Sequence, residues 1–274
     1  MVLPAVVMLA FVQPQPQPAA APAPTKALVP FPHPLITEVL YNVPPGAEGD
    51  ADGDGLRSAT GDEFVELVNP HDRPISLKGY VLTDGKNTRR PTTPSETPAK
   101  REPAGNAPPK RDAPPKPERV ADDDSRVRFV FPDVTLQPGQ VVVVFNGYTG
   151  DETPKKSTGD EQPRKAAVPA DGPPEPIRLS MQITSPYAAF SNTGDCVLLT
   201  DPDGKPVQCI TWGSQPKPPE EFAPLIEHAP ETKARGSITR LGPAKGLVPH
   251  REQPGDLKGL PYSPGVFAQP KPAK

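Results

Sequence analysis

Arg128-Phe-Val-Phe-Pro-Asp-Val-Thr-Leu-Gln-Pro-Gly-Gln-Val-Val-Val-Val-Phe-Asn146 is the stretch of this 274-residue chain that decides the fold. Together with the preceding valine it contains two runs of β-branched and aromatic residues, Val127–Phe131 and Val141–Phe145. Pro138-Gly139 between the runs favours a turn, because proline fixes φ and glycine accepts positive φ. A four-valine run bounded by a turn predicts a strand that is buried on both faces or packed deep in a sandwich. We expect the two runs to form the central pair of strands.

Proline dominates much of the remaining sequence. The chain has 45 Pro, 22 Gly and 34% hydrophobic residues, with a mean hydropathy of -0.52. A packed body of the full length is not expected from so polar a composition. The prolines cluster, and the rest, roughly 145 residues, suits one β-sandwich of ordinary size. We expect one domain with long unstructured additions.

The charge balance argues against a nucleic-acid partner. The net charge is -3 and the sequence pI is about 5.9. Nucleic-acid binders usually carry a concentrated basic stripe, and none is visible here. The basic pairs Arg89-Arg90 and Lys100-Arg101 lie in a Pro-rich segment with acidic residues close by, which is typical of a solvated linker.

The chain begins with the apolar run Met1–Val12, followed by Gln-Pro repeats and Ala19-Ala20-Ala21. Twelve residues are too few to span a bilayer, but they suit the apolar region of a secretory signal with small residues near the cleavage point. We interpret residues 1–21 as a signal peptide, although the usual basic residue is missing; the alternative is an unremarkable apolar start. The prediction is a secreted or cell-envelope protein without a membrane span after removal of the signal.

Short strand-like segments separated by turn residues recur along the chain, and no convincing helical periodicity appears, so the fold class is all-β. A Pro/Ala-rich linker (22–34) precedes a β-sandwich over 35–267, and a tail (268–274) follows it. Two segments with many prolines and few aliphatic residues, 85–126 and 149–176, are expected to be disordered insertions, and 214–234 a polar loop. Such insertions are tolerable where their ends are neighbours in the sheet, since closure cost grows only logarithmically with length. The expected strands are 35–41, 63–69, 75–83, 127–131, 141–145, 177–184, 196–200, 206–212 and 237–241.

A series of short motifs, taken in order, resembles the lamin tail domain family. Some look like its opening strands and central strand pair, and the later ones are similar to the closing pattern of its bacterial members. The resemblance covers about 35–267 without the insertions, and it implies an immunoglobulin-like β-sandwich used for binding or scaffolding. The long Pro-rich inserts depart from the family pattern. The motifs are Glu63-Phe-Val-Glu-Leu-Val-Asn69, Leu77-Lys-Gly-Tyr-Val-Leu-Thr-Asp84, Phe131-Pro-Asp-Val-Thr-Leu-Gln-Pro-Gly-Gln-Val-Val-Val143, Asn192-Thr-Gly-Asp195, Asp203-Gly204, Thr211-Trp-Gly213, Ser237-Ile-Thr-Arg240 and Ser263-Pro-Gly265.

The acidic segment Asp50-Ala-Asp-Gly-Asp-Gly55 is the best candidate for a chemical site. Acidic residues at positions one, three and five with glycine at six match the first half of an EF-hand calcium loop. The twelfth position is Gly61 and not the usual glutamate, so Asp62 or Glu63 would have to substitute. The candidate calcium ligands are Asp50, Asp52, Asp54, Ser58 and Asp62, and the alternative is a solvated acidic turn.

Cys196 and Cys209 lie on the two arms of a hairpin whose turn is Asp201-Pro-Asp-Gly204. A two-residue loop would place the cysteines directly opposite each other, as a disulfide needs. A bulge at Gly204 would shift the register by one residue and turn the side chains to opposite faces. Turn chemistry favours the bulge, so we expect two separate small hydrophobic residues, with the disulfide as the alternative.

No catalytic constellation emerges from the remaining polar residues. Glu63 and Glu66 face opposite sides of one strand, so they cannot act as a paired acid and base. Glu66 shares a face with Phe64 and Val68, where a structural hydrogen bond or solvent exposure is expected. Trp212 is expected in the core. The isolated histidines are expected to be exposed in loops, and they are His33, His71, His228 and His250.

These observations predict a non-enzymatic, exported or cell-surface module that binds or scaffolds a protein or a cell-envelope polymer. The alternative is an accessory, substrate-targeting module of an extracellular hydrolase system, because lamin-tail-like modules are found fused to such enzymes. Nucleic-acid binding is the least favoured function. The predicted function requires no cofactor, and calcium is the one ion to which the acidic segment points.

Overall fold

The computed structural model describes most of the predicted domain. The predicted signal peptide, the insertion at 85–126, the tail at 268–274 and most of the insertion at 149–176 lie outside the described residues. Within the described part, no helix combines the length and apolar character that a membrane span needs. The described residues are 29–84, 127–149, 174–185, 187–214, 218–230, 235–242 and 246–267.

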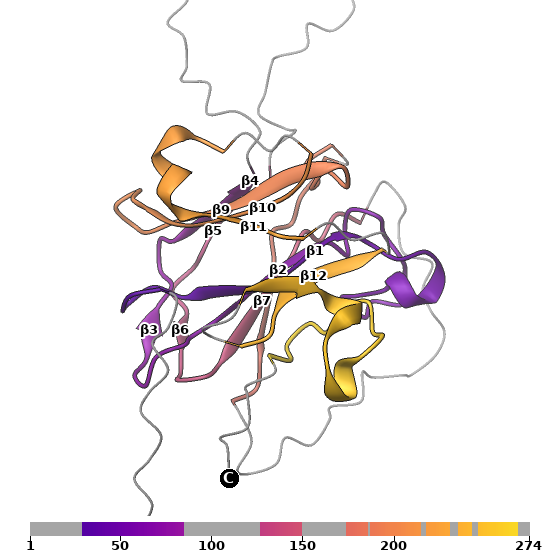
Figure 1. Cartoon of the computed structure of the whole chain (residues 1–274), viewed down its shortest axis with the longest axis horizontal. Helices are drawn as coiled ribbons and strands as arrows, with labels where there is room; N and C mark the ends of the chain where they lie inside the picture. The colour runs from indigo at the N-terminus through magenta and orange to yellow at the C-terminus, as the bar shows by residue number, and fades with distance from the viewer. Residues whose placement is uncertain are drawn as a thin grey trace, which may run out of the picture.

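Two β-sheets stacked face to face form the body of the protein (Figure 1). The six-stranded sheet has the order β13-β12-β1-β2-β7-β8, and the five-stranded sheet has the order β11-β10-β9-β4-β5. The strands of the first are β13 (Leu247–Pro249), β12 (Gly236–Arg240), β1 (Leu35–Asn42), β2 (Phe64–Val68), β7 (Val141–Phe145) and β8 (Ile177–Ser180). Those of the second are β11 (Ile226–His228), β10 (Pro206–Gly213), β9 (Gly194–Thr200), β4 (Val81–Asp84) and β5 (Arg128–Val130).

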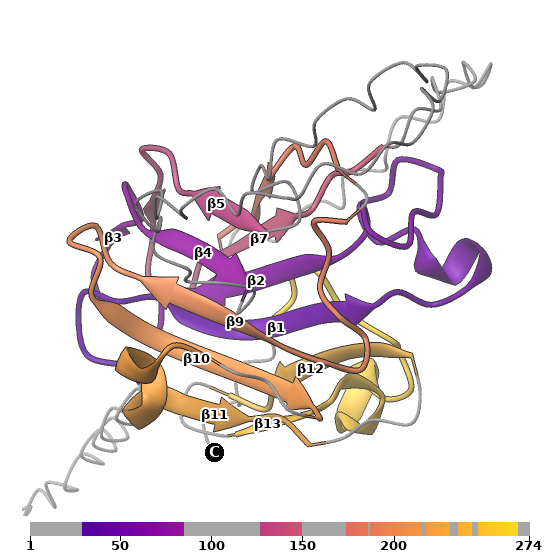
Figure 2. The same cartoon turned by 90° about the horizontal axis from the view of Figure 1, so that it is seen from above.

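The all-β prediction is confirmed, because the helices in the described residues are 3-10 helices of three to six residues. They are η1 (Gly46–Gly49), η2 (Glu220–Leu225), η3 (His250–Glu252) and η4 (Gly255–Leu257). A two-stranded ribbon of β3 (Ile75–Ser76) and β6 (Thr135–Leu136) closes one end of the sandwich (Figures 1 and 2).

Strand β7 is buried on both faces, as its valines predict. Val142 and Val144 face the main core between the two sheets, which also contains Trp212. Val141, Val143 and Phe145 face a second apolar cluster on the outer side of the six-stranded sheet. Because successive side chains of a strand point to opposite faces, one unbroken apolar run serves both clusters.

The first run of the deciding stretch, Val127–Phe131, does not pair with the second run as predicted. Strand β5 pairs with β4 at the edge of the five-stranded sheet, and Arg128 and Val130 are exposed. The two apolar runs are therefore not hydrogen-bonded neighbours but belong to opposite sheets. The predicted turn between them does form, because Gly139 has φ +71° and the Gln140 N–H donates to the Gln137 carbonyl at 2.9 Å.

The predicted strand 75–83 is two strands in different sheets. The Tyr80 N–H donates to the Leu77 carbonyl at 3.0 Å, and Gly79, with φ +80°, completes a turn between β3 and β4. The glycine was expected to mark a bulge or a close approach. A Cβ atom at Gly79 would lie 3.2 Å from the Cβ of Pro202, so the close approach is real.

Two edge strands run parallel to their neighbours. Strand β8 pairs with β7 and ends at Ser180, short of the predicted 184. Strand β11 pairs with β10 and, together with η2, occupies part of the predicted polar loop 214–234. Strand β13 was not predicted, because its three residues carry too little periodicity to read.

Candidate functional site

The acidic loop follows β1 and returns the chain to β2. Its backbone is organised by its own carboxylates, which accept hydrogen bonds from nearby main-chain N–H groups. Asp50 accepts from Gly53 at 2.9 Å and Gly55 at 3.0 Å, and the two glycines adopt φ +78° and +89°. The next two acids form similar turns, since Asp52 accepts from the Asp54 N–H and Asp54 from the Leu56 N–H. Such local hydrogen bonding is typical of aspartate in turns.

Asp62 anchors the loop from its far end. Its side chain is 1% exposed, and one carboxylate oxygen accepts from the N–H groups of Ala51 at 2.6 Å and Asp52 at 3.1 Å. The other oxygen accepts from the Ser58 N–H at 2.6 Å. Asp62 therefore fixes the acidic loop against the start of β2.

The structure brings three of the five predicted calcium ligands together. One carboxylate oxygen from each of Asp50, Asp52 and Asp62 lies within 4.8 Å of the others. Asp54 is outside this group of acids. The Ser58 hydroxyl instead accepts from the Gly61 N–H at 2.8 Å and donates to the Tyr148 carbonyl at 3.3 Å, which ties the loop to the end of β7.

The three carboxylates fit a calcium ion in donor type and spacing. Calcium takes 6–8 oxygen ligands at about 2.3–2.6 Å, so two ligands on opposite sides of one ion lie about 5 Å apart. A carboxylate oxygen that accepts a single N–H bond keeps a second lone-pair site for a cation, and Asp62 has one such oxygen, Oδ2, because its Oδ1 already accepts two. The remaining ligands would have to be carbonyl or water oxygens.

Burial and mutual repulsion disturb the acids of this loop. Burial, together with the charges of the neighbouring acids Asp54, Asp62 and Asp50, raises the pKa of Asp52 to about 6, while the hydrogen bond from the Asp54 N–H opposes the shift. Burial also raises the pKa of Asp62, although three N–H donors oppose it. A bound cation would favour the ionised form of both carboxyl groups.

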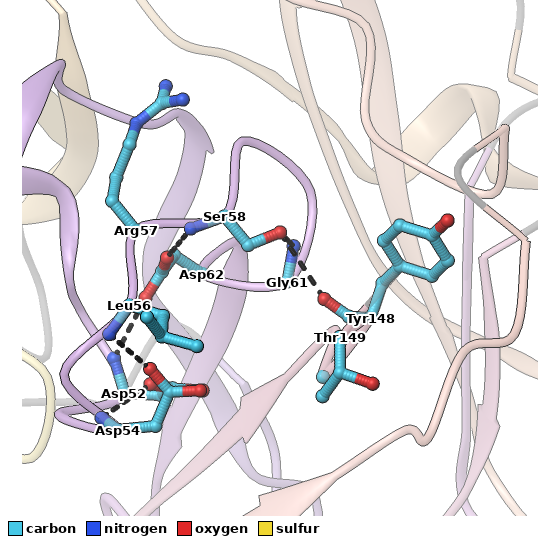
Figure 3. Close-up of a pocket in the computed structure, with 10 residues that line it drawn as sticks. Asp52, Asp54, Leu56, Arg57, Ser58, Gly61, Asp62, Tyr148 and Thr149 are labelled. Carbon is cyan, nitrogen blue, oxygen red and sulfur yellow. Dashed lines mark hydrogen bonds between the residues drawn. The ribbon is translucent and has the colours of Figure 1, made fainter. Parts of the chain in front are cut away.

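A cavity of about 500 Å³ opens beside the loop. Asp52, Asp54 and Leu56 line one side, and Tyr148 and Thr149 lie across from them (Figure 3). A second hollow of about 290 Å³ shares Asp52 and Asp54 and is bounded by the strand β8. There the Arg178 guanidinium donates to the Asp52 carbonyl at 3.2 Å and lies 5.1 Å from the centre of the Phe145 ring. The acidic loop thus separates two adjoining hollows on one face.

Both cysteines lie on the outer face of the five-stranded sheet. Cys196 is paired with Thr211 and Cys209 with Leu198, so the cysteines are diagonal neighbours and not directly opposite. In the turn the Asp201 N–H donates to the Lys205 carbonyl, which moves the register by one residue from that of a two-residue loop, and the register shifts again between Pro206 and Gln208. The expected bulge alone would have turned the side chains to opposite faces, and the second shift returns them to the same face.

Sequence reasoning missed a buried pair of glutamates. Glu38 on β1 is the direct cross-strand partner of Glu66 on β2, and both side chains are at most 1% exposed. Thr37 donates to Glu66 Oε1 at 2.7 Å, and the Gly265 N–H donates to Oε2 at 2.7 Å. The structural hydrogen bond expected for Glu66 is therefore present. The one sequence signal for Glu38 was that it is the only acidic residue of β1, which is otherwise mostly apolar.

Residues 261–267, here called the C-terminal strap, cover this pair. Glu38 accepts from the Ser237 hydroxyl at 2.5 Å and from the Ser263 N–H at 3.1 Å. Burial, together with the charge of Glu66, raises the pKa of Glu38 to about 8, and burial raises the pKa of Glu66 to about 7. Between about pH 4.5 and pH 7 the buried pair therefore retains protons that two exposed glutamates would lose.

The prediction that every histidine is exposed in a loop was wrong for His250, which is buried, and for His228, which is exposed but lies on β11. The His250 side chain is 1% exposed, because Nδ1 donates to the Leu260 carbonyl and Nε2 lies 2.8 Å from the Ser263 hydroxyl. Burial lowers the pKa of His250, which favours the neutral ring. His33 is only partly exposed and contacts the Tyr80 hydroxyl at 2.9 Å. Neither His33 nor His250 belongs to the candidate metal-binding group of Asp50, Asp52 and Asp62.

The two-sheet sandwich and the order of its motifs agree with a known family. The Lamin Tail Domain family matches residues 32–214, about two thirds of the chain. The chain belongs to the lamin tail domain family. No curated protein matches the sequence.

Membership of the lamin tail domain family agrees with the immunoglobulin-like sandwich and with a non-catalytic binding module. The resemblance noted in the sequence extends further than the match, because Ser237–Arg240 and Ser263–Gly265 lie beyond residue 214. In the structure these two segments complete the six-stranded sheet and its outer cover, since β12 pairs with β1 and Ser263 contacts Glu38. The lamin tail domain of this protein therefore depends on residues beyond the matched range.

Proposed function

We propose that this lamin tail domain protein is an exported, non-catalytic binding module for a protein or cell-envelope polymer, and that calcium organises its binding face. The observation that carries the proposal is the cavity of about 500 Å³ between the acidic loop and Tyr148. Cavities of this size that combine an aromatic ring with a few polar groups are the usual form of ligand sites.

The binding face has chemistry for an extended polar ligand. Leu56 is 56% exposed at the edge of the cavity, and Tyr148 is partly exposed across from it. Aromatic rings with one wet edge contribute apolar contact while their hydroxyl forms hydrogen bonds. Arg178 adds a cationic donor on the far side of Asp52. A polymer with hydroxyl and carboxyl groups would meet complementary partners in both hollows.

Calcium would link the three loop carboxylates and offer its open coordination positions to that ligand. Each carboxylate is held by a main-chain N–H, so little ordering would be needed when the ion binds. Loops of this kind in extracellular modules bind calcium with dissociation constants of about 10⁻⁴–10⁻³ M.

Calorimetric titration with calcium chloride tests the metal part of the proposal. The wild-type chain at pH 7.5 should give saturable heat, and the Asp52→Ala variant should give none. The matched control is Asp133→Ala, which removes an exposed acid that pairs with Lys78 away from the loop, and this variant should titrate like the wild type. Equal heats from wild type and Asp52→Ala would remove the calcium site.

The same titration at pH 5 adds a second check. The pKa of Asp52 is about 6, so protons compete with calcium for this carboxylate at the lower pH. Calcium affinity should fall by about tenfold per pH unit below that pKa if one proton is displaced. An affinity that does not change between pH 7.5 and 5 would show that Asp52 is not a ligand.

Co-sedimentation with an insoluble cell-envelope fraction tests the ligand part. Retention of the wild-type chain should require calcium and should be lost in Tyr148→Ala, which opens the cavity wall. Tyr187→Ala is the control, because Tyr187 is 72% exposed and does not line this cavity. Retention that ignores both calcium and Tyr148 would place the binding face elsewhere, and turnover of polysaccharide or nucleic acid by the purified chain would contradict a non-catalytic role.

A further inference from the structure

The cysteine pair carries an inference that is independent of the acidic loop. Cys196 and Cys209 are each 1% exposed and pack in one small cluster with Leu198 and Phe222. This cluster lies on the outer face of the five-stranded sheet, on the opposite side from the main core. Phe222 belongs to η2, which crosses the outer face over β10. The two thiols therefore share a closed apolar site.

The register allows the two sulfur atoms to meet. In an antiparallel pair, diagonal residues on one face have Cα atoms about 7–8 Å apart, beyond the usual disulfide range of about 4.4–6.8 Å. The right-handed twist of paired strands brings one of the two diagonals closer together than the other. Cys196 and Cys209 occupy one diagonal of the β9–β10 pair and pack in the same small cluster, where both are free thiols in the structure.

We propose that Cys196 and Cys209 are a disulfide site, which closes when the chain folds in the presence of a disulfide oxidant such as oxidised glutathione. One cysteine thiolate attacks the glutathione disulfide, forms a mixed disulfide and releases one reduced glutathione. The second cysteine then attacks the protein sulfur of the mixed disulfide and releases the other glutathione. The chain loses two protons and two electrons in total, and the oxidant gains both.

The surroundings of the pair decide when the reaction occurs. The hydrogen bond from Cys209 and burial raise the pKa of the Cys196 thiol, so the folded protein has little of the reactive thiolate. Phe222 packs in the same cluster, and both cysteines are buried from solvent. The bond should therefore close readily during folding and only slowly in the native protein. Proteins exported to oxidising compartments fold under such conditions.

Refolding with and without the oxidant tests the proposal. The full chain is unfolded in denaturant with reductant and refolded in a mixture of oxidised and reduced glutathione, and free thiols are then alkylated under denaturing conditions. The oxidised product should show no alkylation and a mass loss of about 2 Da, and peptide mapping should place the bond between the two cysteines. Its melting temperature should fall by about 5 °C on reduction.

Two variants and one rate complete the design. Cys196→Ser and Cys209→Ser should each retain one alkylatable thiol and show no change in melting temperature on reduction. Native wild-type protein incubated with the same oxidant should form the bond more slowly than the refolding chain. Two alkylatable thiols after oxidative refolding, stable glutathione adducts, or bonds between chains would each overturn the proposal. Because the experiment supplies the oxidant, its result is separate from that of the calcium and envelope assays.

Discussion

Replacing Glu66 by glutamine should make the stability of the protein less dependent on pH. Glu66 and Glu38 are buried cross-strand partners, and both have a raised pKa, about 7 and about 8. In the unfolded chain both groups ionise near 4.5, the ordinary pKa of a glutamate side chain. Between these values the folded protein holds more protons than the unfolded chain, so stability is full below about pH 4.5 and is lost as the pH rises toward 8.

The magnitude follows from proton linkage. Each proton that only the folded state retains lowers the free energy of unfolding by about 1.4 kcal/mol per pH unit. Glutamine cannot ionise, but it keeps an oxygen for the Gly265 N–H and an amide that can donate to Thr37. The variant therefore lacks one titrating group and the repulsion that group exerts on Glu38. From pH 6 to pH 8 the wild type should lose about 2 kcal/mol more than Glu66→Gln.

The hydrogen bonds that Ser237 and Ser263 donate to Glu38 lower its pKa, so burial and the charge of Glu66 must outweigh them for the proton to be retained. His250 gives its Nδ1 proton to the Leu260 carbonyl, so a neutral ring accepts the Ser263 hydroxyl proton at Nε2. The Ser263 hydroxyl also has Glu38 Oε2 as an acceptor at 3.3 Å. His250, 3.8 Å from Glu38 Oε1, affects stability in the opposite sense, because its lowered pKa costs stability as the pH falls.

Urea unfolding followed by tryptophan fluorescence provides the assay. Trp212 is the single tryptophan of the chain and is 1% exposed, so its emission reports loss of the core. Wild type, Glu66→Gln and the exposed control Glu252→Gln are unfolded at half-unit steps from pH 6 to pH 8.5. Differences between variants cancel the contribution of Asp52 and other unaltered groups. If the curves of wild type and Glu66→Gln run parallel over this range, the buried pair holds no extra proton and the reasoning fails.

Two further substitutions test the packing and the hairpin. Leu199→Ala removes a fully buried side chain from the main core and should lower the free energy of unfolding by about 3 kcal/mol, measured by the same urea assay. Gly213→Ala should cost about 2 kcal/mol or more, because φ is +64° and the new Cβ would lie 2.3 Å from the Thr193 carbonyl oxygen. Its control is Gly204→Ala, which has φ +79° but nothing within 4 Å, and which should cost about 1 kcal/mol. Equal losses for the two glycine variants would show that the Thr193 contact relaxes.

The sequence predicted elements wherever a local pattern was sufficient. The four valines of β7 and the Asp201–Gly204 turn of the β9–β10 hairpin are examples, since the Gly204 N–H donates to the Asp201 carbonyl at 2.9 Å as expected. Pairing between distant segments was not accessible in the same way. The two apolar runs of the deciding stretch look like hairpin arms, but β6 pairs with β3 between them and sends the chain across to the other sheet.

The candidate site residues show the same difference between local patterns, which the sequence reveals, and contacts with distant residues, which it does not. The spacing of Asp50 and Asp52 follows from the loop sequence, whereas the place of Asp62 depends on N–H groups ten or eleven residues earlier. His250 is buried because Leu260 and Ser263 return to it, which no local pattern reveals. The relation of the cysteines required two register shifts, and only the one near Gly204 had a sequence signal.

The two Pro-rich additions look alike in composition but differ in their topological roles. Residues 85–126 connect β4 to β5, which are antiparallel neighbours, and the Asp84 N–H donates to the Val127 carbonyl at 3.1 Å. The ends of this addition are therefore adjacent, and a loop ten times longer than a tight turn costs only about 2 kcal/mol more to close. Residues 149–176 connect β7 to β8, which are parallel, so the chain must travel back along the strand before pairing can begin. A parallel connection needs about a dozen residues or more, which makes the second addition a required crossover and the first an insertion that the sandwich only tolerates.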